Sequence, residues 1–221
     1  MFIGHFGVAL AAKRVDKNIS LGLLLFAAVF ADILFFALVL AGVERMSIVP
    51  GITAASPFDF TYYPYSHSLI ASLFWAGLFF VIIKIAAHRY DSLKNRVAPV
   101  VMGALVLSHF FLDVTAHRAD LPLLPGDSYK IGLGLWNYFL ASYLIEVLIV
   151  FIGLWIYLKS TKGLTFGGRY GMIIFSIFLL VLFTASMMAP PPSDIIGFAI
   201  FALVYQLLTV LVAAWLDRKR V

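Results

Sequence analysis

The apolar residues of this chain fall into long runs, separated by short polar or Pro/Gly-rich breaks such as DSLKNR and APPPSD. A helix needs about 20 consecutive apolar residues to cross the hydrocarbon core of a bilayer. Six runs approach or exceed that length, at residues 20–42, 65–87, 97–117, 135–158, 169–189 and 194–216. The pattern therefore predicts an all-α fold, a polytopic membrane helical bundle of about six transmembrane helices.

The first twelve residues, MFIGHFGVALAA, are apolar but too short to span. We expect a short N-terminal half-helix that dips into the bundle, with Lys13 and Arg14 at its polar edge. The alternative is a helix that lies flat on the membrane surface. A re-entrant helix is tolerated only where protein covers its polar ends. Because no basic region precedes the apolar residues, we expect no cleavable signal peptide.

The composition favours one integral membrane domain over residues 1–221. Hydrophobic residues make up 63% of the chain and charged residues 12%, whereas soluble domains are about one quarter charged. We expect residues 1–158 to form a metal-site core and residues 159–221 a two-helix C-terminal addition. With no cysteine, any metal must be bound by histidine and carboxylate groups.

Basic residues are distributed unevenly between the two sides of the predicted spans. Thirteen fall on one side, namely Lys13, Arg14, Lys17, Lys84, Arg89, Lys94, Arg96, Lys159, Lys162, Arg169, Arg218, Lys219 and Arg220. Only Arg45, Arg118 and Lys130 fall on the other side. The positive-inside rule predicts that the first group, and with it the C-terminus, is cytoplasmic. The net charge of +5 is then explained by topology, and we expect no nucleic-acid partner.

One predicted span carries three polar groups in the stretch LSHFFLDVTAH. His109, Asp113 and His117 lie at positions i, i+4 and i+8, so on a helix they form a single stripe. His109 lies twelve residues past Val97, roughly 18 Å into the span. Placing an ionisable group at this depth costs free energy of insertion. Such groups usually face the interior of the bundle and belong to functional sites.

Other spans place similar groups at a comparable height. Asp32 lies twelve residues past Ser20, roughly 18 Å into the first span. Glu146 lies eleven residues past Leu135, roughly 16 Å from the outer end. His67 lies near the outer end of the second span. The fifth and sixth spans carry no ionisable residue in their interiors, so the polar groups gather in the first four spans.

These groups predict a divalent metal site. Spacing of i and i+4 lets one helix supply two ligands, and other spans must supply the rest. The candidate ligands are His5, Asp32, His67, His109, Asp113, His117 and Glu146. Imidazole and carboxylate suit Zn²⁺, with Mn²⁺ or Fe²⁺ as alternatives. The alternatives that involve no metal are structural: a buried ion pair of His109 with Asp113, a helix-end role for His117 and a helix-start role for His67 within YSHS.

Three residues are candidates for catalysis. Asp32 or Asp113, if not a ligand, could act as a general base. Arg118 follows His117 and its guanidinium would suit a phosphate group, although a positive residue at a helix C-terminus is also common. The aromatic residues at the span ends are expected to form an interfacial belt. They are Tyr62, Tyr63, Tyr65, Trp136 and Tyr138.

Several short motifs resemble a known family. The segments GHFGVALAAK, YSHSL, LSHFFLDVTAHR and DLPLLPG, with the lone acid of the first span, resemble bacterial membrane-bound metal-dependent hydrolases over residues 1–158. That family is thought to be distantly similar to zinc-dependent phospholipase C and to zinc single-strand nucleases. The resemblance implies an all-helical zinc site with ligands at His5, Asp32, His67, His109 and Asp113. Glu146 matches the last acid, but Ser142 stands where a histidine is expected, which implies one or two metal ions rather than three.

The sequence thus predicts a membrane-embedded metal-dependent hydrolase in the bacterial inner membrane. Its site would face outward among membrane lipids and act on a phosphoester, either a lipid or a lipid-linked phosphate. Two other functions stay open. Midplane acids and histidines also occur in transporters coupled to protons or metal ions, and a bound metal could serve only as a structural staple.

Overall fold

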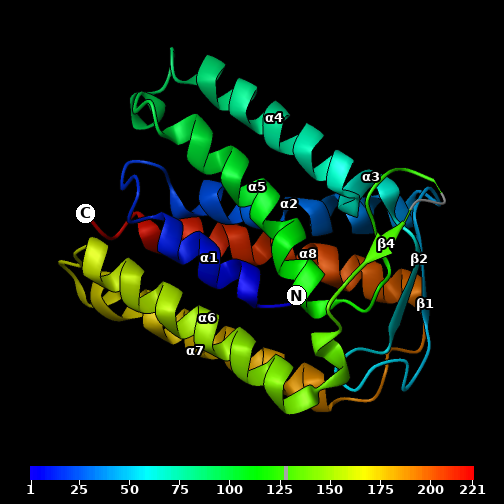
Figure 1. The fold of residues 1–221 in the computed structure, drawn as a ribbon. Coiled ribbons are helices and arrows are strands. Elements are labelled where there is room, and N and C mark those ends of the chain that lie inside the picture. The colour runs from blue at the N-terminus through cyan, green and yellow to red at the C-terminus, as the bar shows by residue number, and fades with distance from the viewer. Residues whose placement is uncertain (127–128) are drawn as a thin grey trace.

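The structure, a computed structural model, describes residues 1–126 and 129–221 (Figure 1). Within these residues, six helices are long and apolar enough to cross a membrane. They are α2 (Leu21–Leu40), α4 (Leu69–Ala86), α5 (Ala98–Ala116), α6 (Phe139–Ser160), α7 (Phe166–Met188) and α8 (Ile195–Asp217). The predicted all-α membrane bundle of about six spans is confirmed.

The N-terminal half-helix α1 (Gly4–Ala12) enters the bundle and ends there. It packs against α2, α5 and α6, and the N-terminus lies in the middle of the bundle (Figure 1). A Cβ atom on Gly153 of α6 would lie 2.0 Å from the carbonyl oxygen of Gly7, so both helices need glycine at this crossing. The re-entrant arrangement is confirmed, and the surface-bound alternative is wrong.

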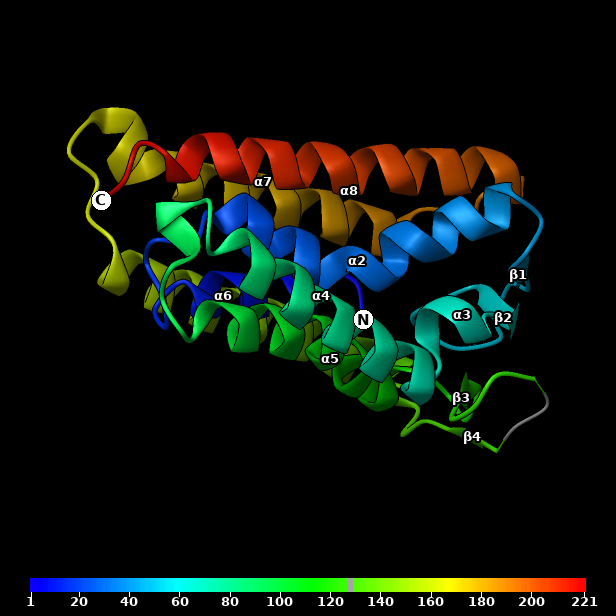
Figure 2. The same cartoon turned by 90° about the horizontal axis from the view of Figure 1, so that it is seen from above.

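Small elements gather at one end of the bundle, which we call the hairpin end (Figure 2). Strands β1 (Arg45–Ile48) and β2 (Phe58–Tyr62) pair antiparallel, with Ser47 opposite Asp59. Strands β3 (Leu121–Pro122) and β4 (Lys130–Ile131) form a second short pair. The short helices α3 (Pro64–His67) and η2 (Leu135–Asn137) also lie here, and the turn η1 (Asp91–Leu93) joins α4 to α5 at the opposite end.

Two spans begin later than the sequence predicts. The second is interrupted at Ser68, which has an extended backbone and accepts a hydrogen bond from Ala71 N, so α3 is separate from α4. The fourth begins at Phe139, because Gly134 takes a left-handed backbone and the 3-10 turn η2 follows. Glu146 therefore lies seven residues into α6, roughly 10 Å from its start rather than 16 Å.

A buried ion pair closes the end opposite the hairpin end. Lys13 Nζ lies 2.6 Å from Asp217 Oδ2, and the same carboxylate accepts bonds from Leu21 N and the Tyr157 hydroxyl. One acid thus ties the α1–α2 connection and α6 to the last turn of α8. Helix α8 also packs along α2, where a Cβ on Gly22 would lie 2.4 Å from Ala214 Cβ. The last helix is joined to the bundle along its length.

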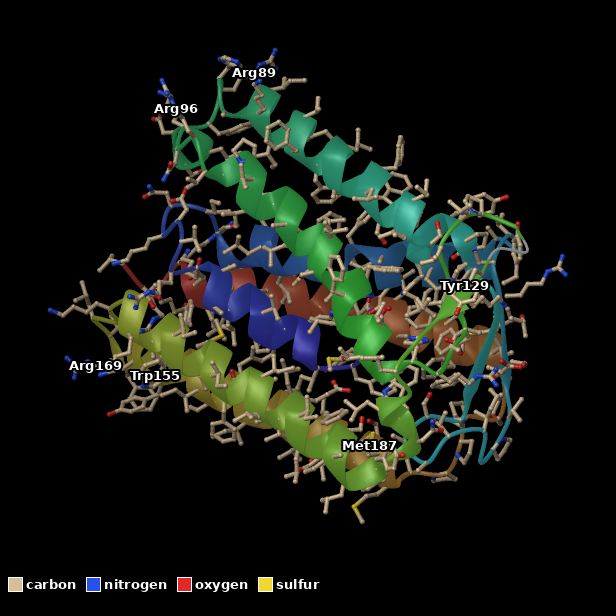
Figure 3. The ribbon with its side chains drawn as sticks, viewed as in Figure 1. Arg89, Arg96, Tyr129, Trp155, Arg169 and Met187 are labelled. Carbon is tan, nitrogen blue, oxygen red and sulfur yellow. The ribbon has the colours of Figure 1, made fainter. Side chains whose placement is uncertain are left out.

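Positive side chains extend from this same end. Arg89, Arg96 and Arg169 point away from the bundle there (Figure 3). Between the two ends the surface is apolar, with residues such as Trp155 exposed. The structure is therefore an integral membrane bundle with its basic loops at one end, and which face of the membrane that end meets stays a prediction.

Candidate metal centre

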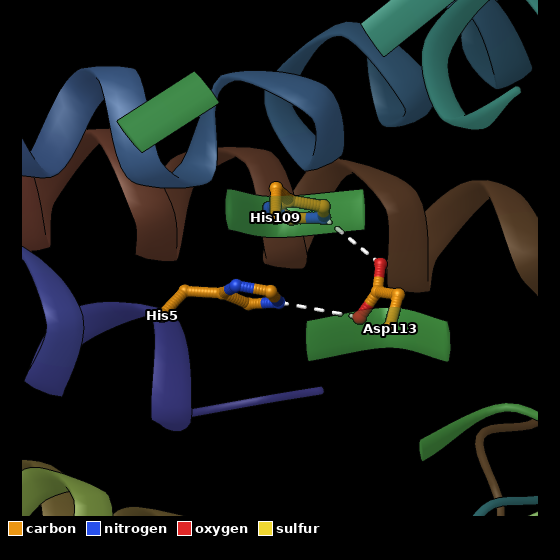
Figure 4. A group of neighbouring side chains, drawn as sticks. All are labelled: His5, His109 and Asp113. Carbon is orange, nitrogen blue, oxygen red and sulfur yellow. Dashed lines mark ion pairs between the residues drawn. The ribbon is translucent and has the colours of Figure 1, made fainter. Parts of the chain in front are cut away.

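Helix α5 and the half-helix α1 bring three polar side chains together in the bundle interior. His109 and Asp113 lie one turn apart on α5, and the His5 ring stacks on the His109 ring with centroids 3.8 Å apart (Figure 4). All three side chains are buried. Because α1 ends in the middle of the bundle, it can present His5 at the depth of the α5 stripe.

Asp113 is the central acid of this cluster. Its Oδ1 lies 3.3 Å from His5 Nε2 and also contacts the N-terminal ammonium of Met1. Its Oδ2 lies 3.1 Å from His109 Nε2 and 3.6 Å from His67 Nε2. Each oxygen of this one carboxylate therefore faces a different set of nitrogen atoms.

Asp32 joins the cluster from α2. Its Oδ1 lies 3.5 Å from both His67 Nε2 and His109 Nε2. The donors thus form two groups that share His109, one with His5 and Asp113 and the other with Asp32 and His67. Side chains from α1, α2, α3 and α5 therefore meet at one position, as a bundle-centre site requires.

The hydrogen bonds behind two histidines assign their tautomers. His109 Nδ1 lies 2.8 Å from the Ala28 carbonyl oxygen, which can only accept, so Nδ1 carries the proton. His67 Nδ1 lies 2.7 Å from Ser66 Oγ, and the Ser66 hydroxyl donates to Glu44 Oε2 at 2.5 Å. His67 Nδ1 is therefore a donor as well. In its neutral form each ring directs the lone pair of Nε2 toward the acids.

This donor set fits a divalent cation. A lone pair that faces a carboxylate is unfavourable unless a proton or a cation lies between them, and His109 Nε2 has no hydrogen-bond partner among the described residues. The four carboxylate oxygen to Nε2 distances from Asp32 and Asp113 to His67 and His109 run from 3.1 to 3.6 Å. Tetrahedral Zn²⁺ with bonds near 2.05 Å holds its ligands about 3.3 Å apart.

Glu146 has a different position from the one its depth suggested. Its Oε2 accepts hydrogen bonds from Phe2 N at 2.8 Å and Gly4 N at 3.1 Å. It lies at the N-terminus of α1, where a negative charge is stabilised by unpaired backbone N–H groups. The structure does not bring it into either donor group. Glu146 instead holds the helix that carries His5.

His117 lies one turn beyond Asp113, in an aromatic box. Its ring is 4.2 Å from Trp136 and 4.9 Å from Phe60, measured between centroids. Its Nδ1 lies 3.0 Å from Asp120 Oδ1, which also accepts from the Tyr63 hydroxyl. The structure leaves His117 outside both donor groups.

The predicted aromatic belt is wrong for Tyr63 and Trp136, which are buried around His117. Tyr62, Tyr65 and Tyr138 are exposed.

Arg118 points away from the donor groups. Its guanidinium pairs with Asp59 and lies 3.2 Å from Asp120 Oδ2. It lines a smaller cavity of about 520 Å³ that also contains Lys130. Arg118 therefore fixes Asp120, which in turn holds His117, and it is not placed beside the metal-donor atoms.

Two buried acids of the site were missed in the sequence. Glu44 follows the first span directly, and its carboxylate accepts from Tyr65 N, Ser66 N and Ser66 Oγ. Asp120 lies three residues after His117. The spacing of His117 and Asp120 was a readable signal for a His–Asp pair, but nothing near Glu44 in the sequence indicates that it reaches Ser66.

A large cavity of about 920 Å³ adjoins the donor groups. Asp32, His67, Asp113 and His117 line it, and the Asp32 side chain keeps 21% of its surface exposed. His109, by contrast, is fully enclosed. The cluster is therefore accessible from the side of Asp32.

No family model, curated protein or solved structure matches the chain.

Proposed function

We propose that this chain is a membrane-embedded, metal-dependent hydrolase that cleaves phosphoesters. The observation that carries the proposal is the open side of the donor cluster. A structural metal site is closed by protein ligands, whereas a catalytic site keeps one position accessible. Here Asp32 is partly exposed to the large cavity, while His109 behind it is buried.

The residues that would hold the ion are His67, His109 and Asp113, with His5 completing a second position, and Asp32 beside them is then free to act as a base. Zn²⁺ is the ion that this donor set suits best, and Mn²⁺ and Fe²⁺ are alternatives. When bound, such an ion supplies an activated water and polarises the phosphoryl group. The bonds of Ser66 and Ala28 to the two histidines keep both Nε2 atoms directed at the ion.

Asp32 is the acid placed to move a proton. In the proposed step the oxygen of water adds to phosphorus and the P–O bond to the departing alcohol breaks. The proton of the water passes to the Asp32 carboxylate, and the departing alcohol takes a proton from solvent. The choice of a phosphoester is supported by the resemblance of the motifs around His67 and His109 to metal-dependent hydrolases.

The closed end of the bundle argues against a transport path. A transporter needs polar groups along its whole route. Below the cavity, Ile19, Leu21 and Leu24 are fully buried, and the Lys13–Asp217 pair seals the end of α8. In the described chain the ionisable groups of the cavity are confined to the hairpin half, which suits a site entered from one side.

The test is hydrolysis of bis-p-nitrophenyl phosphate by purified protein loaded with Zn²⁺ in detergent. Asp32→Asn should abolish activity while the folded protein is retained. The matched control is His88→Ala, because His88 is exposed in the turn after α4. A protein without bound metal by elemental analysis, and with a melting temperature unchanged by chelation, would contradict the proposal. Metal or proton flux in proteoliposomes that depends on Asp32 would favour a transporter instead.

A further inference from the structure

The large cavity extends well beyond the donor groups and is mainly apolar. Leu25, Val29 and Phe36 of α2 form one wall, and Leu179 and Phe183 of α7 form another. Helix α8 lines it from Gly197 to Thr209, a rise of roughly 18 Å. We call this apolar part, between α2, α7 and α8, the chamber. A water-soluble phosphoester needs no such volume.

Two residues that line the cavity, one on α7 and one on α8, are also exposed. Leu182 of α7 and Phe201 of α8 both line the cavity, yet they are 38% and 65% exposed. Each lies six residues from the hairpin end of its helix, roughly 9 Å into the span. The two helices lie beside one another (Figure 2). An entrance between them would therefore be at the level of lipid hydrocarbon.

We propose that the chamber binds one hydrocarbon chain of a membrane amphiphile whose phosphate group lies at the metal centre. This inference rests on the proposed hydrolase function and names its substrate class. The charged end of such a molecule would lie against Asp32, His67 and His117, and its chain would enter from the bilayer between α7 and α8. The surface that would line this entrance is apolar, which suits a ligand that arrives from lipid rather than from water.

Polar residues at the far end set a limit to the chamber. Tyr205, Gln206 and Thr209 line it there, and Gln206 Oε1 is buried without a hydrogen-bond partner in the described residues. A hydrocarbon chain that reached this level would lie against polar side chains rather than an apolar wall, which is less favourable. These polar residues thus limit how long a chain the chamber accommodates.

The test compares three probes: hexadecyl phosphate and butyl phosphate, which share a phosphate group, and hexadecanol, which has the long chain without the phosphate. Ala202 is buried and lines the chamber, whereas Val204, two residues along α8, is 49% exposed. Ala202→Phe fills the chamber, and Val204→Phe places the same ring on the outer surface. Native mass spectrometry of zinc-loaded protein released from detergent counts the molecules bound as each probe is titrated. The melting temperature in detergent reports that each variant is folded.

We expect wild-type protein to bind one hexadecyl phosphate per chain. Ala202→Phe should weaken this binding roughly tenfold or more, because overpacking a filled site is costly. Val204→Phe should bind as wild type does, and butyl phosphate should bind equally to all three proteins. If Ala202→Phe loses its zinc, Ala202→Leu is used, with a smaller loss expected.

Failures of the two proposals are distinguishable. If butyl phosphate binds only to zinc-loaded protein and Ala202→Phe does not weaken hexadecyl phosphate, the chamber proposal is overturned and the metal function stands. If hexadecanol binds and is excluded by Ala202→Phe, but zinc adds nothing to phosphate binding, the chamber stands. In that outcome the phosphoester hydrolase is overturned.

Discussion

Removing the Ser66 hydroxyl should weaken metal binding without touching a metal donor. In the structure Ser66 Oγ accepts from His67 Nδ1 at 2.7 Å and donates to Glu44 at 2.5 Å. Ser66→Ala removes the acceptor that holds the proton on Nδ1. His67 is then free to rotate or to place its proton on Nε2, where the metal should bind.

The expected effect can be scaled from comparable sites. Loss of a group that orients a metal-bound histidine typically lowers metal affinity about 10- to 100-fold. This corresponds to a loss of roughly 1.4 to 2.7 kcal/mol of binding free energy. Here the loss should fall within that range, because Glu44 keeps its two bonds from the backbone N–H groups of Tyr65 and Ser66. The local backbone should therefore stay in place while the ring loses its fixed orientation.

The assay is competition for Zn²⁺ against a chromogenic chelator, with purified protein in detergent. Ser68→Ala is the matched control, since Ser68 is two residues away and equally buried. Its hydroxyl caps α4 through Ala71 N at 3.1 Å and makes no hydrogen bond to a histidine in the described part of the chain. Ser68→Ala should lower the melting temperature, as the loss of a cap costs about 1 kcal/mol, but leave zinc affinity unchanged.

Two results would refute this reasoning. If Ser66→Ala binds zinc as tightly as wild type while His67→Ala does not, the tautomer of His67 is not set by Ser66. If Ser68→Ala weakens zinc binding as much as Ser66→Ala, the effect comes from general loosening of the α3–α4 junction rather than from the Glu44–Ser66–His67 chain.

Three further predictions address the rest of the bundle. His109→Ala should remove all bound zinc, because both donor groups share this residue, and elemental analysis of the folded variant checks it. Lys13→Met should destabilise the bundle by about 3–5 kcal/mol by leaving Asp217 buried without its cation. The double variant with Asp217→Leu should recover only part of that stability in denaturant unfolding, because Leu21 N and the Tyr157 hydroxyl lose their acceptor. Burial and the Asp120 carboxylate raise the pKa of the Tyr63 hydroxyl well above its ordinary 10.0. The stability of the wild type should therefore fall as pH rises above 10, because Tyr63 then ionises only in the unfolded chain. Thermal melts should show that Tyr63→Phe lacks this part of the fall, and below that pH the two proteins should respond to pH in the same way.

The parts of the fold that follow from local pattern were predictable. Long apolar runs gave the spans, and the spacing of His109 and Asp113 placed both on one face of α5. The depth of Asp32, counted along a straight helix, brought it to the level of His109. These inferences need only helical rise and periodicity, which tertiary contacts do not change.

The rest depends on contacts between distant segments. Glu44 and Asp120 are loop acids that would be solvated by default, and only the folding of the hairpin end buries them against Ser66 and His117. Glu146 was predicted as a metal ligand, and the structure leaves it outside both donor groups. Its carboxylate pairs with backbone N–H groups of the half-helix α1, and backbone groups leave no trace in a sequence pattern.

The crossing of α1 and α6 at Gly7 and Gly153 has a consequence for the order of events during synthesis. Residues 4–12 are translated long before α6. Yet α6 supplies both Gly153, which allows the close approach of α1, and Glu146, which accepts hydrogen bonds from the N-terminus of α1. The helix that carries His5 can therefore reach its final place only after most of the chain has entered the membrane. A nascent chain that ends shortly after α5 would contain every proposed donor but would lack the surface that positions His5, so complete metal acquisition becomes one of the last steps of maturation.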